Sequence, residues 1–159
     1  MTASGGGDWS TPLDLFNQLN AEFDFGLDAA ANDANHKCER WLGPGGVAPD
    51  ALVPDAHWGR LAQGKAVWLN PPYGRDVGRW IDKAWWASHH HGVTVVMLLP
   101  ARTDTKWFHD IVVPLATEIR FLQGRLKFSG AKAGALFPSM VVVFRAPVDG
   151  VYQWARWAR

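Results

Sequence analysis

Cysteine is nearly absent from this sequence, since Cys38 is the single one among 159 residues. One cysteine cannot build an internal disulfide framework, and its scarcity fits a reducing compartment such as the cytoplasm. No apolar run approaches the ~18 residues that indicate a membrane-spanning helix. The sequence therefore excludes a disulfide-rich scaffold and a membrane span. Cys38 is expected to fill space in the core, with a nucleophile as the alternative.

Features of a signal peptide and of a second domain are also missing. The Gly- and Ser-containing start has no basic stretch followed by an apolar one, so residues 1–8 are expected to form a flexible tail. No linker or internal repeat divides the rest, and 48% of the residues are hydrophobic. Residues 9–159 are therefore expected to form one domain with a sizeable core.

Net charge is low, at +1, but the charge is unevenly distributed. Residues 1–101 contain 7 Lys or Arg and 11 Asp or Glu, whereas residues 102–159 contain 9 and 4. A basic final third could lie against nucleic-acid phosphates, although ordinary scatter of charges would look the same.

Tryptophan, by contrast, is abundant, with ten in the chain. Trp80 and Trp85 fall on the apolar face of an expected helix and have a core explanation. Trp9 and Trp107 stand beside polar turn residues, where a flat ring could stack on a nucleotide base.

Apolar runs alternate with helical patterns along the chain. Strands are expected at 23–27, 66–69, 93–99, 118–121, 126–128 and 140–144. The run at 93–99 is continuously apolar, as in a parallel strand covered on both faces. Residues 43–60 are rich in Gly and Pro and predict a loop. The fold class predicted is α/β, with a largely parallel sheet flanked by helices.

Helices are predicted where polar residues precede apolar faces. Thr11 is a candidate N-cap with Pro12 in the first helical position, and Asp14 could complete a capping box. Asp76 could begin a second helix that ends at Gly92. A third is expected after Thr103 or Asp104 and up to Pro114, and an amphipathic segment is expected at 151–157.

The most informative motif is Asn70-Pro71-Pro72-Tyr73, directly after the strand at 66–69. The Asn70 side-chain oxygen and the Pro71 carbonyl could accept the two N–H groups of a planar exocyclic amine and free its lone pair. Proline fixes the backbone, so the carbonyl is already oriented for reaction. Tyr73 could stack on the base. The motif predicts methyl transfer to a nitrogen, with a simple turn as the alternative.

Polar residues follow three expected strands: Asp28, the motif at 70–73, and the segment 100–105. In a parallel sheet the carboxyl ends of the strands lie at one edge, where ligands bind. We therefore expect these three clusters to meet in one site.

The chain resembles the phage and prophage DNA adenine-N6 methyltransferase family, often called Dam-type, from about Trp9 to Phe144. The resemblance is carried by the segments 8–12, 27–31, 68–73, 98–108 and 124–128, in that order. It implies a single-domain, Rossmann-like methyltransferase sheet. It also implies S-adenosylmethionine as methyl donor, with no metal, and the N6 amine of adenine in double-stranded DNA as acceptor.

The resemblance also assigns residues to the donor. Asp28 would hold the methionine amine, since a carboxylate matches that cation. Thr11 and Pro12 would touch the methionine end, and the preceding Trp9 and Ser10 are also assigned to donor binding. Asn70 and the small Ala29 and Ala30 would lie near the donor, and Asp55 could lie near its adenine. The turn after Asp28 lacks the usual glycines, which leaves the donor contacts there open.

For DNA, the resemblance makes five residues candidate contacts: Arg102, Lys106, Arg125, Lys127 and Phe128. The cations could hold phosphates, and Phe128 could stack on a flipped base or simply point into the core. The target adenine must leave the duplex to reach Asn70, so base flipping is implied. The loops at 43–60 and 129–137 would have to select the DNA sequence.

Three other interpretations stay open. The same tetrapeptide serves methylation of cytosine N4, guanine N2 or protein glutamine. A Trp-rich, non-enzymatic binder of single-stranded DNA is a second class, and a decayed phage enzyme is a third. A metal site at His89-His90-His91 is disfavoured, because consecutive helical residues point in different directions.

Overall fold

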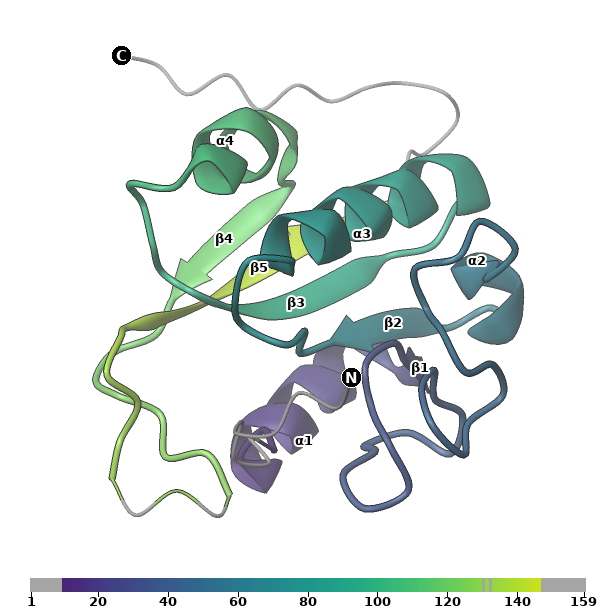
Figure 1. Ribbon diagram of the computed structural model, residues 1–159, viewed down its shortest axis with the longest axis horizontal. Coiled ribbons are helices and arrows are strands. Elements are labelled where there is room, and N and C mark those ends of the chain that lie inside the picture. Colours follow the sequence, from purple (N-terminus) through teal and green to yellow (C-terminus); the bar gives the residue numbers. More distant parts are fainter. Residues whose placement is uncertain (1–9, 130, 132, 147–159) are drawn as a thin grey trace.

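The computed structural model describes residues 10–129, 131 and 133–146 (Figure 1). Five strands form one sheet in the order β1-β2-β3-β5-β4. The strands are β1 Phe25–Asp28, β2 Ala66–Leu69, β3 Val95–Pro100, β4 Glu118–Phe121 and β5 Ser139–Phe144. The helices are α1 Leu13–Phe23, α2 Trp58–Leu61, α3 Val77–His91, the π-helical η1 Phe108–Val112 and α4 Val113–Leu115.

The sheet is mixed, whereas the sequence predicted a largely parallel one. β1, β2 and β3 pair in parallel, but β5 is antiparallel to both of its neighbours, β3 and β4. β4 and β5 follow each other without a crossover helix, and consecutive strands joined in this way pair antiparallel. The parallel part of the sheet is therefore confined to β1, β2 and β3, the three strands that precede the predicted site residues.

Apolar side chains cover both faces of the sheet. In β3, Val95, Met97 and Leu99 pack on the face that α3 covers, whereas Val96 and Leu98 pack on the opposite face with α1. This alternation is the two-residue period of a strand. It agrees with the prediction of a strand covered on both faces. Figure 1 shows α1 and α3 on opposite sides of the sheet.

Cys38 belongs to the core on the α1 side. Its side chain is buried, and the burial, together with the charge of Asp28, raises the pKa of the thiol to about 12. A thiol with so high a pKa is a poor nucleophile at neutral pH. The structure therefore supports Cys38 as a core residue.

One helix boundary and one expected capping interaction differ from the prediction. α1 begins one residue later than expected, so Pro12 takes the N-cap position and Thr11 caps nothing. Asp76 does stand at the N-cap of α3, but its side chain makes no capping hydrogen bond. Gly92 ends α3 as predicted, in the left-handed conformation with φ of 63° that glycine adopts without steric cost.

Three further segments differ from the prediction. The expected helix after Thr103 starts at Lys106 and is largely π-helical over 108–112. The stretch 126–128, expected to be a strand, belongs to neither a helix nor a strand, and the next residue, Ser129, forms an isolated bridge to Ser10. The Gly- and Pro-rich region contains the short helix α2 near its end. The predicted segment 151–157 lies outside the described residues.

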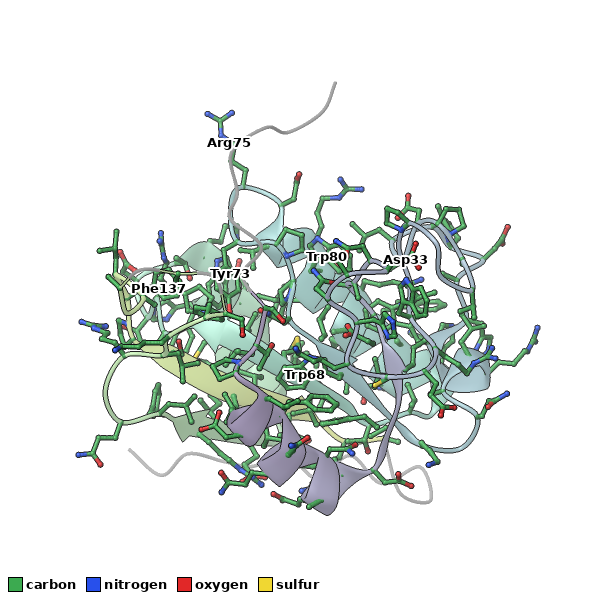
Figure 2. The ribbon with its side chains drawn as sticks, turned by 90° about the horizontal axis from the view of Figure 1, so that it is seen from below. Asp33, Trp68, Tyr73, Arg75, Trp80 and Phe137 are labelled. Atoms are coloured by element: carbon green, nitrogen blue, oxygen red, sulfur yellow. The ribbon has the colours of Figure 1, made fainter. Side chains whose placement is uncertain are left out.

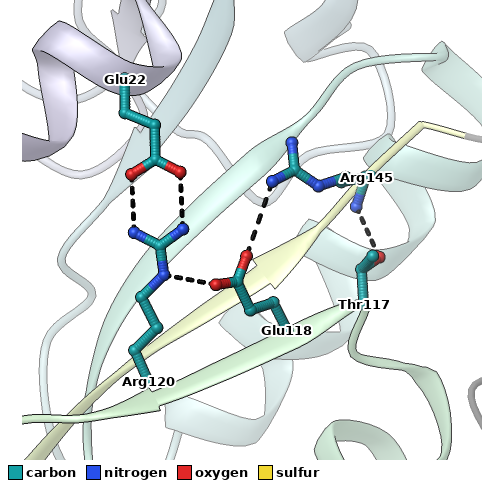
Figure 3. Close-up of polar contacts among 5 residues, drawn as sticks. All are labelled: Glu22, Thr117, Glu118, Arg120 and Arg145. Atoms are coloured by element: carbon teal, nitrogen blue, oxygen red, sulfur yellow. Dashed lines mark hydrogen bonds and ion pairs between the residues drawn. The ribbon is translucent and has the colours of Figure 1, made fainter.

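An ion-pair network joins α1 to the outer edge of the sheet (Figure 3). The Arg120 guanidinium of β4 donates to both Glu22 carboxylate oxygens of α1, at 2.7 and 2.6 Å, and to Glu118 at 2.6 Å. Arg145 lies 3.5 Å from Glu118. The hydrogen bonds from Arg120 lower the pKa of both glutamates. The network ties two elements that are 98 residues apart. Within the described residues, no helix has the length and apolar character to cross a membrane.

Candidate active site

A cleft opens where the three parallel strands end. Its volume is about 1280 Å³, which exceeds the roughly 300–1,000 Å³ of a typical small-molecule pocket. The three predicted clusters meet here, because Asp28, Asn70 to Tyr73, and Pro100, Arg102 and Thr105 all contribute to the lining. A smaller hollow of about 400 Å³ lies at the opposite edge of the sheet, and no predicted site residue lines it.

Asn70 follows β2 directly and is half-buried in the cleft. Its Nδ2 donates a hydrogen bond to Thr11 Oγ1 at 3.2 Å. Thr11 is only 2% exposed, so this bond is shielded from solvent. Pro71 is buried behind Asn70, while Pro72 is exposed at the cleft. The two prolines fix the backbone, and Thr11 fixes the side-chain amide.

Tyr73 is held at both ends of its ring. Its hydroxyl donates to the Leu98 carbonyl oxygen at 3.0 Å, and its burial raises its pKa. The ring meets Phe128 and Phe137 edge to face, with centroid separations of 6.3 and 5.5 Å. Figure 2 shows Tyr73 and Phe137 close together, and both belong to the lining of the cleft. Tyr73 follows β2, and the position of its hydroxyl is set by Leu98 of the neighbouring strand β3.

Asp28 is a buried carboxylate in the lining of the cleft. It is 3% exposed and accepts backbone N–H bonds from Ala30 at 3.3 Å and from Lys37 at 3.0 Å. Burial raises its pKa to about 6 despite these bonds. The Lys37 ammonium points elsewhere, to Ser10 Oγ at 2.7 Å. A cation bound beside Asp28 would offset the cost of its burial.

The turn after Asp28 is made compact by pairing with a second segment. Ala31 N–H donates to the Leu42 carbonyl, and Leu42 N–H donates to the Asp28 carbonyl. Gly43 follows, with φ of 134° and no room for a Cβ, which would lie 2.0 Å from the Ala31 carbonyl oxygen. The turn after Asp28 has no glycine of its own. Gly43 of the paired segment instead allows the two backbones to approach closely at Ala31.

The predicted site residues divide into two groups. Those in the cleft lining are Ser10, Thr11, Asp28, Ala30, Asn70, Pro71, Pro72, Tyr73 and Arg102. Those that the structure describes outside the lining are Pro12, Ala29, Asp55, Lys106, Arg125, Lys127 and Phe128. Trp9 lies outside the described residues.

The residues outside the lining have definite surroundings. Ala29 is fully buried, and Phe128 is 2% exposed in the core on the α1 side, where no base could stack on it as it stands. Lys106 forms an ion pair with Asp110. Arg125 and Lys127 are exposed. Asp55 is absent from the lining, and Asp50 lines the cleft in its place.

Several lining residues were not predicted from the sequence as site residues. They include Lys37, Asp50, Arg75, Trp80, Leu136 and Phe137. Figure 2 shows Arg75, two residues after Tyr73, extending away from the body of the molecule. Its place beside the tetrapeptide was a usable signal. Leu136 and Phe137 fall in the loop 129–137, which the sequence made a candidate for selecting the DNA sequence, but no motif singled out these two residues within it.

The fold and the cleft together define a mixed α/β protein with an Asn-Pro-Pro-Tyr corner in a large site at the strand ends. A model of the family described as DNA N-6-adenine-methyltransferase (Dam) matches residues 2–148, so the chain belongs to this family. The resemblance inferred from the sequence motifs is thereby confirmed.

Two phage proteins are similar to the chain. A DNA N-6-adenine-methyltransferase of Haemophilus phage HP1 (strain HP1c1) is 32% identical over 144 residues, which cover 86% of this chain and 77% of that protein. A protein of the same name from Escherichia phage T1 is 35% identical over 104 residues, which cover 64% of this chain and 39% of that protein.

Proposed function

We propose that this chain is an enzyme that transfers a methyl group from S-adenosylmethionine to the N6 amine of adenine in double-stranded DNA. The observation that carries the proposal is the shared cleft. Asn70 and Pro71 lie in it together with the buried carboxylate Asp28, in a chain of the adenine-N6 family. The phage origin of the two relatives supports action in the cytoplasm of a bacterial host. The parallel strands β1 to β3, with helices on both faces, support a Rossmann-like methyltransferase sheet.

The residues of the cleft fit the donor. S-adenosylmethionine supplies an electrophilic methyl group on a sulfonium centre. Asp28 accepts hydrogen bonds from backbone N–H groups and has a raised pKa, so the donor's ammonium group is the kind of partner that would stabilise its charge. Ala30 and Gly43 line the neighbouring wall and are small, which allows a ligand to approach the backbone. Asp50 replaces Asp55 as our candidate for contact with the donor's adenine.

The acceptor amine is activated by Asn70 and Pro71. The lone pair of an exocyclic amine is delocalised into the ring, which makes the amine a poor nucleophile. Asn70 Oδ1 and the Pro71 carbonyl oxygen would accept its two N–H groups and favour a tetrahedral nitrogen. Because the backbone is fixed by proline and the amide by Thr11, little reorganisation accompanies the reaction. The amine proton leaves after transfer, so no general base is required.

The base is expected to enter the cleft beside Tyr73. Its ring is braced by Phe128, so we assign Phe128 to the support of Tyr73 rather than to stacking on DNA. Entry of the target adenine requires base flipping. Arg102 at the cleft, with the exposed Arg125 and Lys127, would hold phosphates.

The experiment that tests the function uses tritiated S-adenosylmethionine and unmethylated duplex DNA, with Asn70→Ala as the matched variant. The products are digested to nucleosides and separated. We expect label in N6-methyladenine with the parent and a loss of about 100-fold or more with the variant, since Asn70 supplies a bond that counts in the transition state. Label in cytosine or guanine, or equal label from both proteins, would contradict the proposal.

A further inference from the structure

Leu136 is the most exposed large hydrophobic side chain among the described residues, at 94%. It also belongs to the lining of the cleft. A leucine exposed at the mouth of a site does not stabilise the fold of the free protein, because its apolar surface remains in water. The neighbouring residues explain how it is kept there.

The backbone around Leu136 is fixed on both sides. Before it, the buried Ala135 donates its N–H to the Leu126 carbonyl at 2.8 Å. After it, the Phe137 ring packs against Tyr73, and the Pro138 carbonyl accepts the Ala101 N–H at 2.8 Å. A side chain between such anchors projects outward from a fixed position beside the site.

The surroundings of Leu136 are cationic. The Arg102 guanidinium lies 5.7 Å from the centre of the Phe137 ring. Arg125 lies next to the same loop, since a Cβ added to Gly134 would be 3.2 Å from the Arg125 Cβ, and both Arg125 and Lys127 are exposed. One apolar side chain among cations does not resemble the broad apolar patch of a protein–protein interface. It matches DNA, which presents phosphates around an apolar base stack.

We propose that Leu136 is the wedge residue of this enzyme: it enters the DNA base stack at the place that the target adenine leaves. Flipping a base breaks its stacking and opens an apolar gap, and Leu is among the side chains that proteins insert between bases. The fixed position of Leu136 beside Tyr73 would bring the wedge and the base pocket to the same nucleotide. The inference rests on the proposed function and adds the step by which adenine is made accessible.

The test compares the parent with Leu136→Ala on duplex and on heat-denatured unmethylated DNA. In single strands no gap needs filling, so the variant should keep the parental rate there. On the duplex we expect its rate to fall about tenfold or more, because the cost of unstacking the adenine is no longer offset. Leu136→Met, which keeps an apolar wedge, should retain most duplex activity. Phe121→Ala, at an apolar residue that is 64% exposed and outside the cleft lining, should behave as the parent.

A second readout detects the flipped base itself. The methylated adenine, once mapped in the product of the parent, is replaced by fluorescent 2-aminopurine in a short duplex. Binding of the parent should increase the fluorescence, and binding of Leu136→Ala should do so much less. Equal loss on both kinds of DNA, or full duplex activity of Leu136→Ala, would overturn the wedge. Absence of label from the parent on both DNAs would instead overturn the proposed function, and the wedge with it.

Discussion

The side chain of Asn70 is fixed by Thr11, which lies 59 residues earlier in the chain. The bond from Nδ2 to Thr11 sets the rotation of the amide and hence the direction in which Oδ1 points. Thr11 is buried, so water does not compete for this bond. The Thr-Pro element therefore acts on the catalytic corner as well as at the start of α1, a role that the capping interpretation missed.

Asp28 makes the stability of the protein depend on pH. Its pKa is about 6 in the folded state against 3.8 in the unfolded chain. A raised pKa means that the carboxyl contributes its stability below about pH 4 and loses it as the pH rises through about 6. We expect the unfolding free energy to fall by about 3 kcal/mol across this window through Asp28 alone. Asp28→Asn, which cannot ionise, should lack this component in urea titrations at several pH values.

Donor binding should follow the opposite trend from stability. The ammonium group of S-adenosylmethionine needs the ionised carboxylate, so its affinity should weaken as the pH falls below about 6. Calorimetric titration from pH 5 to 8 would measure this, and Asp28→Asn should bind weakly at every pH. In the urea titrations, a difference in unfolding free energy between the parent and Asp28→Asn that stays constant from pH 4 to 8 would contradict the raised pKa of Asp28.

Among the elements, the strands of the core were predictable and their pairing was only partly so. The continuous apolar run at 93–99 predicted β3, which the structure places at Val95–Pro100 with both faces covered. The reversed direction of β5 is not visible in the strand itself, because apolar strands look alike in either orientation, and its one signal is the missing crossover helix between β4 and β5. The π-helical turns of η1 likewise escape a pattern that assumes 3.6 residues per turn.

The network around Arg120 should stabilise the attachment of α1 to β4. Arg120→Met keeps much of the side-chain length and removes the bidentate pair with Glu22. We expect a loss of about 1–2 kcal/mol, above the usual value for exposed pairs because one guanidinium serves two carboxylates. For a domain of this size that lowers the melting temperature by roughly 2–8 °C.

Lys65 provides the matched control for Arg120. It forms one ion pair with Asp24, with the side chains 51% and 71% exposed, so Lys65→Met should change the melting temperature little. Both variants should keep methyl transfer, since both residues lie outside the cleft lining. If the two substitutions lowered the melting temperature equally, the network would carry no special stability.

At the scale of the whole molecule, the sequence predicted which residues meet in the site more completely than it predicted the fold around the site. The convergence of Asp28, Asn70 and Arg102 followed from one rule about strand ends, which depends only on the parallel part of the sheet. Leu136 and Phe137 could not be located in this way, because their position depends on how the loop before β5 folds back onto Tyr73. The burial of Phe128 favours the core alternative that the sequence interpretation had kept beside base stacking.

The division of charge along the chain suggests from which side DNA approaches. Acidic Asp28 and Asp50 lie in the part of the cleft assigned to the donor, whereas Arg102, Arg125 and Lys127 belong to the basic final third.

If Arg125 and Lys127 each neutralise one phosphate, the double variant Arg125→Ala/Lys127→Ala should lower the slope of log K against log salt by about 1.8 for duplex DNA. Fluorescence anisotropy from 50 to 200 mM salt would measure this slope. Lys65→Ala, at the opposite edge of the sheet, should leave it unchanged. An unchanged slope in the double variant would mean that DNA approaches from another side and that Arg125 and Lys127 have no part in binding.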